Sequence, residues 1–285
     1  MHLLLLVTLL WAFSFSLIGV YLAGQVDSYF SVLTRIVLAA LVFLPFIKWR
    51  QVQPKLALQL MAIGAIQLGL MYVFYYHSFL LLTVPEVLIF TIFTPIYITL
   101  IYDLLKGRFS PYFLFTAVLA VIGAAIIRYD AITDDYLLGF AVVQGANLCF
   151  AIGQVGYKVL MENHGEAVNQ RSTFGFFYLG ALAVALLLWA VKGGEQYPTT
   201  LTQWGVLVWL GAVASGLGYF LWNRGATMVS SGQLAVMNNL LIPAGLIVNL
   251  LIWNRQADLT ALAIGGGIIV LSMVLNQRWL QQRTQ

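Results

Sequence analysis

Three ionisable side chains, Arg35, His77 and Glu86, lie within long apolar stretches of the sequence, where a charge is costly and usually functional. Arg35 lies about 9 Å below the outer end of a helix predicted over 29–47, at about 1.5 Å of rise per residue. A guanidinium is planar and binds a carboxylate in bidentate fashion, so Arg35 is the first candidate for a carboxylate clamp. The alternative is an Arg35–Glu86 ion pair that joins two helices. A pair that opened for a substrate would act as a gate.

Glu86 and His77 are also candidates for gating or proton coupling. A buried carboxyl group and an imidazole can both exchange a proton in the physiological range. His77 lies so close to the predicted membrane interface that a plain hydrogen-bonded role is the alternative.

Four residues of the stretch 84–103 recur at helical spacing, namely Glu86, Phe90, Thr94 and Tyr97. At 3.6 residues per turn they share one face of a helix. That face would present an acid, an aromatic ring and two hydroxyls to a cavity.

Two amides, Asn238 and Asn239, lie near the middle of the stretch 231–252. An amide offers both a donor and an acceptor, so either could bind a polar substrate. The alternative is a hydrogen bond between helices. Further cavity candidates are Trp11, Ser14, Gln67, Tyr72, Asn147 and Trp222.

Other chemistries find no support in the residues. The single cysteine and the three scattered histidines have no metal-ligand spacing, so we expect no metal and no cofactor. No glycine-rich phosphate loop and no nucleophile–base pair is present, so we expect neither a nucleotide motor nor an enzyme. A net charge of +4 gives no basic stripe, so nucleic acid is not an expected partner.

The elements that carry these residues are membrane-spanning helices. Hydrophobic residues make up 61% of the chain and charged residues 8%, against about 25% charged in a soluble domain. A helix needs roughly 20 apolar residues to cross a bilayer, and the apolar runs are continuous rather than alternating. We predict an all-α integral membrane protein with ten spans, at 3–23, 29–47, 56–80, 84–103, 111–127, 138–160, 173–191, 203–223, 231–252 and 259–279.

Basic residues predict the orientation, because they accumulate in cytoplasmic loops. With both termini in the cytoplasm, the inner loops hold Lys48, Arg50, Lys55, Lys106, Arg108, Lys158, Arg171, Arg224, Arg278 and Arg283. The outer loops hold only Arg128, Lys192 and Arg255. Anchoring at the inner membrane surface explains Lys158 and Arg224.

An internal repeat is predicted from the helix count. Five helices in 1–137 and five in 138–285 force the second copy to enter the membrane from the opposite side, which is an inverted-topology repeat. The segments Ile63–Pro95 and Gly211–Pro243 align without a gap. Pro85, Pro95 and Pro243 are expected to kink or break helices near a cavity and to free backbone carbonyls.

Several blocks of sequence resemble the EamA-type branch of the drug/metabolite transporter superfamily, and within it the bacterial biotin transporters. They are AFSFSLIGVYLAGQVDSYF (12–30), RIVLAALVFLPF (35–46), FTPIYITLIYD (93–103), VIGAAIIRYD (121–130), FAIGQVGYKVLME (150–162), ASGLGYFLWNRGATMV (214–229), MNN (237–239) and PAGLIVNLLIW (243–253). Their order, spacing and polar insertions together are specific, and they cover nearly the whole chain.

The resemblance implies a secondary, ATP-independent transporter that imports the vitamin biotin across a bacterial inner membrane by alternating access. Its partners would be biotin and the lipid bilayer, with no ATPase subunit. Biotin carries one carboxylate, for which Arg35 is the candidate, and a ureido ring, for which Asn238 and Asn239 are candidates. The alternative is an exporter or exchanger of amino acids, amines or drugs with the same fold. An amine would call for a central acid more than a central arginine.

Overall fold

The computed structural model describes residues 1–105, 107, 122, 134–165 and 168–253, and isolated positions between 260 and 279. Within these residues, eight helices are long and apolar enough to cross a membrane. Each overlaps one of the predicted spans, and the all-α membrane fold predicted from the sequence is confirmed. The predicted span 111–127 and most of the span 259–279 lie outside the described residues.

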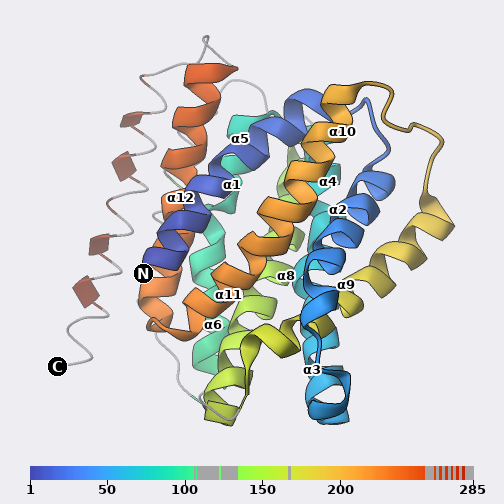
Figure 1. Cartoon of the computed structure of the whole chain (residues 1–285). Coiled ribbons are helices and arrows are strands. Elements are labelled where there is room, and N and C mark those ends of the chain that lie inside the picture. Colours follow the sequence, from blue (N-terminus) through green and yellow to red (C-terminus); the bar gives the residue numbers. More distant parts are fainter. Residues whose placement is uncertain are drawn as a thin grey trace.

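The α-helices give the order of the chain in Figure 1. They are α1 (His2–Tyr21), α2 (Ser28–Phe43), α3 (Pro54–Gly64), α4 (Met71–Leu81), α5 (Val84–Phe90), α6 (Thr94–Leu105), α8 (Asp134–His164), α9 (Gln170–Lys192), α10 (Leu201–Val208), α11 (Gly218–Thr227) and α12 (Ser231–Ile252). Three short 3₁₀ turns are η1 (Leu44–Phe46), η2 (Trp49–Gln51) and η4 (Thr91–Phe93). Two π-helical segments are η3 (Ala65–Leu70) and η6 (Trp209–Leu217).

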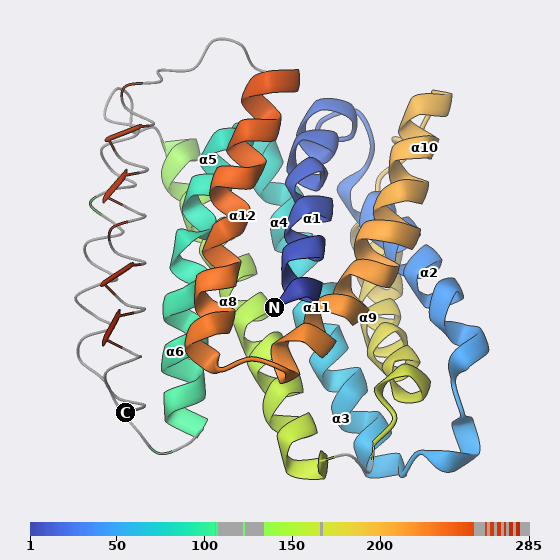
Figure 2. The ribbon, with the colours of Figure 1, turned by 60° about the vertical axis from the view of Figure 1, so that its left-hand side comes forward.

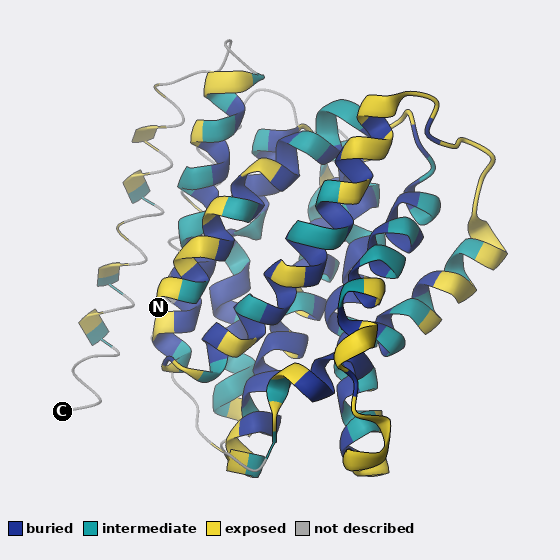
Figure 3. Cartoon of the chain, viewed as in Figure 1, coloured by how far each residue is buried: buried dark blue, intermediate teal, exposed yellow. Residues whose placement is uncertain are grey.

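The outer surface of the molecule carries many large apolar side chains, and the interior holds a mainly apolar core with some buried polar groups. Large apolar side chains such as Leu58, Leu187 and Leu251 are exposed by 68%, 64% and 73%. Exposed and intermediate positions cover the outer faces of the helices, and buried positions face inward (Figure 3). A bilayer solvates apolar side chains, and a helix satisfies its own backbone hydrogen bonds, so this arrangement suits lipid.

Helices from the first part of the chain pack against helices from the second part. Helices α1 and α2 pack against α12, α11 and η6, while α8 and α9 pack against α3, η3, α4 and α6. Figures 1 and 2 show α8 passing through the middle of the bundle and α1 lying beside α12. The cavity described below is lined by helices from both parts of the chain.

Close helix approach depends on glycine at a few positions. A Cβ atom added at Gly64 of α3 would lie 1.8 Å from the Phe177 carbonyl oxygen of α9. A Cβ atom at Gly180 of α9 would lie 1.9 Å from the Met61 carbonyl oxygen of α3. Small residues thus let these backbones touch, which is how membrane helices commonly pack. At Gly211 a Cβ atom would press on Leu38, so this glycine brings η6 close to α2 and to Arg35.

Candidate functional site

A cavity of about 80 Å³ lies between helices from both parts of the chain. It is lined by Trp11, Ser14, Phe15, Ile18, Arg35, Met71, Tyr72, Tyr75, Thr91, Thr94, Ala146, Asn147, Phe150, Tyr219, Asn238 and Leu241. The predicted binding residues that reach it are Trp11, Arg35, Tyr72, Thr94, Asn147 and Asn238. Ser14, a further cavity candidate from the sequence, lines it as well.

The charged part of the cavity is built around Arg35, which is 2% exposed. Its Nη2 donates to Tyr72 Oη at 2.7 Å and to Ser215 Oγ at 3.0 Å, and its Nη1 donates to Tyr76 Oη at 3.2 Å. The guanidinium carbon also lies 4.2 Å from the centroid of the Tyr72 ring. Neutral hydroxyls and an aromatic face therefore hold this cation in position.

The predicted Arg35–Glu86 ion pair is not formed among the described residues. Arg35 bonds to hydroxyls instead, whereas Glu86 Oε2 accepts a hydrogen bond from the backbone N–H of Thr83 at 2.6 Å. Glu86 lies in the first turn of α5, where a carboxylate caps the free N–H groups of a helix. This hydrogen bond holds Oε2 of Glu86 at the start of α5.

The π-helical segment η6 forms the wall behind Arg35. Its Ser215 hydroxyl bonds to Arg35, and the Trp11 indole N–H donates to the Ala214 carbonyl at 2.8 Å. Tyr178 Oη lies 2.9 Å from the Ser215 carbonyl and 2.6 Å from the Gly216 carbonyl, so its single hydrogen is shared between them. Side chains from α1, α2 and α9 thus meet on one irregular segment, a setting in which π-bulges are often functional.

A helix break at η4 positions Asn147. Pro95 has no N–H, and the chain before it tightens, so that the Thr94 N–H bonds to the Thr91 carbonyl. The Phe90 carbonyl is thereby released and accepts a hydrogen bond from Asn147 Nδ2 at 2.8 Å. The expectation that this proline frees a backbone carbonyl next to the cavity is confirmed.

The same break changes which residues of α5 and α6 face the cavity. Of the predicted face, only Thr94 lines it. The Phe90 ring packs against Phe140 at 5.0 Å between centroids, and Tyr97 Oη donates to Gln144 Oε1 at 3.2 Å. Glu86 caps α5, as described above. The expectation of a single four-residue face is corrected, because a 3₁₀ turn shifts the rotation between the two helix segments.

Asn238 is held from behind by Gln154 and Trp222. Asn238 Nδ2 donates to Gln154 Oε1 at 3.2 Å, and the Trp222 indole N–H donates to the same oxygen at 3.1 Å. Trp222, which was also predicted to contact substrate, does not line the cavity, and its ring lies 4.9 Å from that of Trp11. Gln154 was not among the predicted residues, although it is a polar residue within an apolar run, as Gln67 is.

The remaining predicted residues lie away from the cavity. Asn239 is buried but does not line it. The His77 ring shares a 2.7 Å hydrogen bond with the Val73 carbonyl and contacts Tyr29, and it does not line the cavity. Gln67 is fully buried within η3 and is also absent from the lining.

Tyr75 is a lining residue that the sequence analysis missed. It follows Met71 by one helical turn and lies close to Tyr72 on the same side of α4, so all three line the cavity. Helical spacing from Tyr72 could have identified it.

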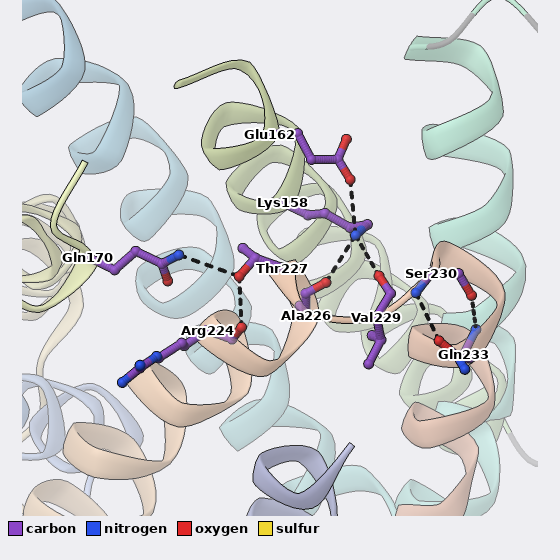
Figure 4. Close-up of polar contacts among 9 residues, drawn as sticks. All are labelled: Lys158, Glu162, Gln170, Arg224, Ala226, Thr227, Val229, Ser230 and Gln233. Carbon is purple, nitrogen blue, oxygen red and sulfur yellow. Dashed lines mark hydrogen bonds and ion pairs between the residues drawn. The ribbon is translucent and has the colours of Figure 1, made fainter. Parts of the chain in front are cut away.

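A second polar cluster lies at the end of the bundle that was predicted to be cytoplasmic (Figure 4). Lys158 Nζ donates to the Val229 carbonyl at 2.6 Å and to the Ala226 carbonyl at 3.1 Å, and it lies 3.0 Å from Glu162 Oε1. Lys158 is 4% exposed, so its interpretation as a surface anchor was wrong. Its side chain lies under the turn between α11 and α12, where backbone carbonyls at a helix end need donors.

An apolar exterior, buried polar groups and an internal cavity together define a multi-pass membrane transporter. A profile of the EamA-like transporter family matches residues 1–129 and 137–277. The chain belongs to this family.

Proteins of similar sequence align with all or nearly all of this chain. It is 56% identical over 278 residues to a probable biotin transporter of Pseudomonas aeruginosa, covering 97% of each protein. It is 51% identical to biotin transporters of Salmonella typhimurium and Escherichia coli, covering 100% of this chain and 95% of each relative. A crystal structure with a TM-score of 0.71 covers 98% of this chain and 96% of its own, and its 18% identity shows a common fold alone.

Proposed function

We propose that this protein is a secondary transporter that imports biotin across the bacterial inner membrane by alternating access, without ATP. The full-length similarity to proteins named biotin transporters supports the substrate. The observation that carries the proposal within the molecule is Arg35, a buried cation at the wall of the cavity.

The surroundings of Arg35 favour an anionic substrate. A buried charge is stable only when it is well paired or hydrogen-bonded, and no described carboxylate forms an ion pair with this arginine. The carboxylate of biotin would complete the pair, while the aromatic rings of Trp11, Phe150 and Tyr219 would enclose its apolar part.

The inverted repeat of 1–137 and 138–285 is part of the proposal. Two observations support it: the family profile matches the chain in two successive segments, and contacts are exchanged between the two parts. Inverted repeats bind substrate where their halves meet near the middle of the bilayer, which agrees with a cavity lined by both.

The closed lysine cluster supports alternating access. In the proposed topology, Lys158 seals the cytoplasmic end through the Ala226 and Val229 carbonyls, so release of substrate to that side requires these bonds to break. Pockets for drug-sized ligands measure about 300–1,000 Å³, so a cavity of about 80 Å³ must also widen to hold biotin.

Uptake of labelled biotin tests the function directly. Cells that lack both biotin synthesis and their own biotin transporter should accumulate label when this protein is expressed. Labelled amino acids, offered to the same cells, test whether the cargo is of another class. Amino-acid uptake without biotin uptake would overturn the proposal.

Reporter fusions test the orientation. A reporter that is active only in the periplasm should be silent after Gln285 and active after Asp134. Activity at the C-terminus would overturn both the topology and the inverted repeat.

The lysine cluster has its own test. A cysteine placed at Ala226, with Cys149 replaced by serine, should react slowly with a thiol reagent applied from the cytoplasmic side. Lys158→Met should speed this reaction, because the turn loses its donor. Equal labelling rates with Lys158 and with Lys158→Met would remove the cluster from the gate.

A further inference from the structure

The amide of Asn147 has a fixed orientation. Its Nδ2 donates to the Phe90 carbonyl at 2.8 Å and to Gln144 Oε1 at 3.1 Å. A backbone carbonyl can only accept, so the amide nitrogen must face Phe90. Both N–H groups of Asn147 are used within the protein, and no described residue donates to its Oδ1. What Asn147 offers a ligand is therefore an acceptor.

Asn238 is fixed in the same sense. Its Nδ2 donates to the Leu234 carbonyl at 2.8 Å and to Gln154 Oε1 at 3.2 Å. The Trp222 indole can only donate, and it also bonds to Gln154 Oε1, which fixes the orientation of that glutamine. Asn238 Oδ1 accepts one long hydrogen bond, of 3.4 Å, from Gln154 Nε2. It keeps a lone pair for a ligand in the cavity.

Two residues that line the cavity carry hydroxyls that could donate hydrogen bonds to a ligand. Ser14 Oγ and Tyr75 Oη are buried, and neither has a hydrogen-bond partner among the described residues. Ser14 as a whole is 6% exposed. A buried hydroxyl without a partner is costly, so these groups point to a ligand atom that accepts hydrogen bonds.

We infer that this cavity recognises a cyclic urea by hydrogen-bond polarity. Asn147 Oδ1 and Asn238 Oδ1 accept the two N–H groups of the ureido ring, and Ser14 and Tyr75 donate to its carbonyl oxygen. The inference rests on the proposed function. It adds which protein atoms bind the ureido ring, whereas Arg35 is proposed to bind the carboxylate.

A ureido ring carries two donors and one acceptor, which matches two fixed acceptors and two free hydroxyls. A ligand that offers only acceptors would donate to neither asparagine oxygen in a buried site. Such missing hydrogen bonds are what makes polar recognition selective. The cavity should therefore reject analogues in which a ring N–H is blocked.

Competition with labelled biotin tests this on the unmodified protein. Biotin methylated at either ureido nitrogen should compete roughly 5- to 150-fold less well than biotin, because one hydrogen bond is lost. Thiobiotin, with sulfur in place of the ureido oxygen, should compete less well because sulfur is a weak acceptor. Desthiobiotin keeps the ureido ring and the carboxylate, so it should compete about as well as biotin.

Variants test which residues cause the weaker competition, called here the penalty, of each analogue. Asn238→Leu should weaken biotin uptake at normal expression, and Asn147→Ala and Asn238→Leu should each reduce the penalty for N-methylation. Ser14→Ala with Tyr75→Phe should reduce the penalty for thiobiotin and leave the N-methyl penalty in place. Tyr75→Phe keeps the ring contacts with Phe15 and Phe79, so it is a conservative change.

The outcomes separate this inference from the proposed function. If the cells take up no biotin, the proposed function fails. If they take up biotin but the N-methylated analogues compete as well as biotin itself, only the inference fails. Penalties that are unchanged in all of these variants would likewise overturn the assignment to these residues.

Discussion

The two π-helical segments, η3 and η6, occupy matching places in the chain but have different neighbours. The gap-free pairing of Ile63–Pro95 with Gly211–Pro243 sets Gln67 of η3 opposite Ser215 of η6. Ser215 bonds to Arg35 and lies behind the cavity. Gln67 is fully buried, and neither its Nε2 nor its Oε1 has a partner among the described residues.

The facing helices explain the difference. Helix α2 presents Arg35 to η6, whereas α9 brings Ala181 and Val184 against Gly69 of η3. A Cβ atom at Gly153 of α8 would lie 2.0 Å from Gln67 Cβ, so η3 is tightly packed on that side too. A helix irregularity alone does not make a binding site. The proposed site includes η6 and not η3, because the helices facing η6 supply donors and a charge.

The largest effect is expected at the charge. Arg35→Ala should abolish biotin uptake, because it removes the only basic side chain on the cavity wall described here. Arg35→Lys should retain partial activity, since it keeps the charge but loses the planar fork. Uptake and membrane expression should be measured together.

A double variant controls for the alternative ion pair. If Arg35 only paired with Glu86, then Arg35→Met with Glu86→Leu should restore folding and much of the uptake, because apolar residues often replace a buried pair. We expect no such rescue, since Arg35 bonds to hydroxyls and Glu86 caps α5.

A smaller effect is expected at the wall behind the charge. Tyr178→Phe removes the donor to the Ser215 and Gly216 carbonyls and should lower the free energy of unfolding by about 1–3 kcal/mol. Thermal unfolding in detergent measures this. Tyr197→Phe, at an exposed tyrosine, is the matched control and should leave the melting temperature unchanged. Equal behaviour of the two variants would contradict a structural role for Tyr178.

The smallest effect is expected in η3. Gln67→Leu removes a buried amide that has no partner among the described residues, so stability should be equal or higher and uptake about unchanged. Strong loss of uptake at normal expression would mean that Gln67 finds a partner in another conformation. The contrast between η3 and η6 would then hold for one state of the transport cycle only.

The sequence predicted the membrane fold and the main cavity residues because their signals are local. An arginine or an asparagine within an apolar run is recognisable without a structure, so Arg35 and Asn238 were identified. Pro95 predicted a helix break. The rotation between the two helix segments, which turns Phe90 away from the cavity, depends on the type of turn that forms at the break.

Other features depend on tertiary contacts that a sequence does not reveal. Lys158 has the position of a surface anchor, and only the folded turn shows its side chain buried beneath two carbonyls. Tyr178 is one of 14 tyrosines in the chain, and nothing in its spacing indicates that it supports η6.

The most direct test of the account compares biotin with its neutral amide as competitors of labelled biotin. If Arg35 binds the carboxylate, the unmodified protein should strongly prefer biotin over the amide. Arg35→Lys should keep part of this preference, and any residual binding to Arg35→Ala should show almost none. An equal preference in the unmodified protein and in Arg35→Ala would contradict the claim that Arg35 is the carboxylate site.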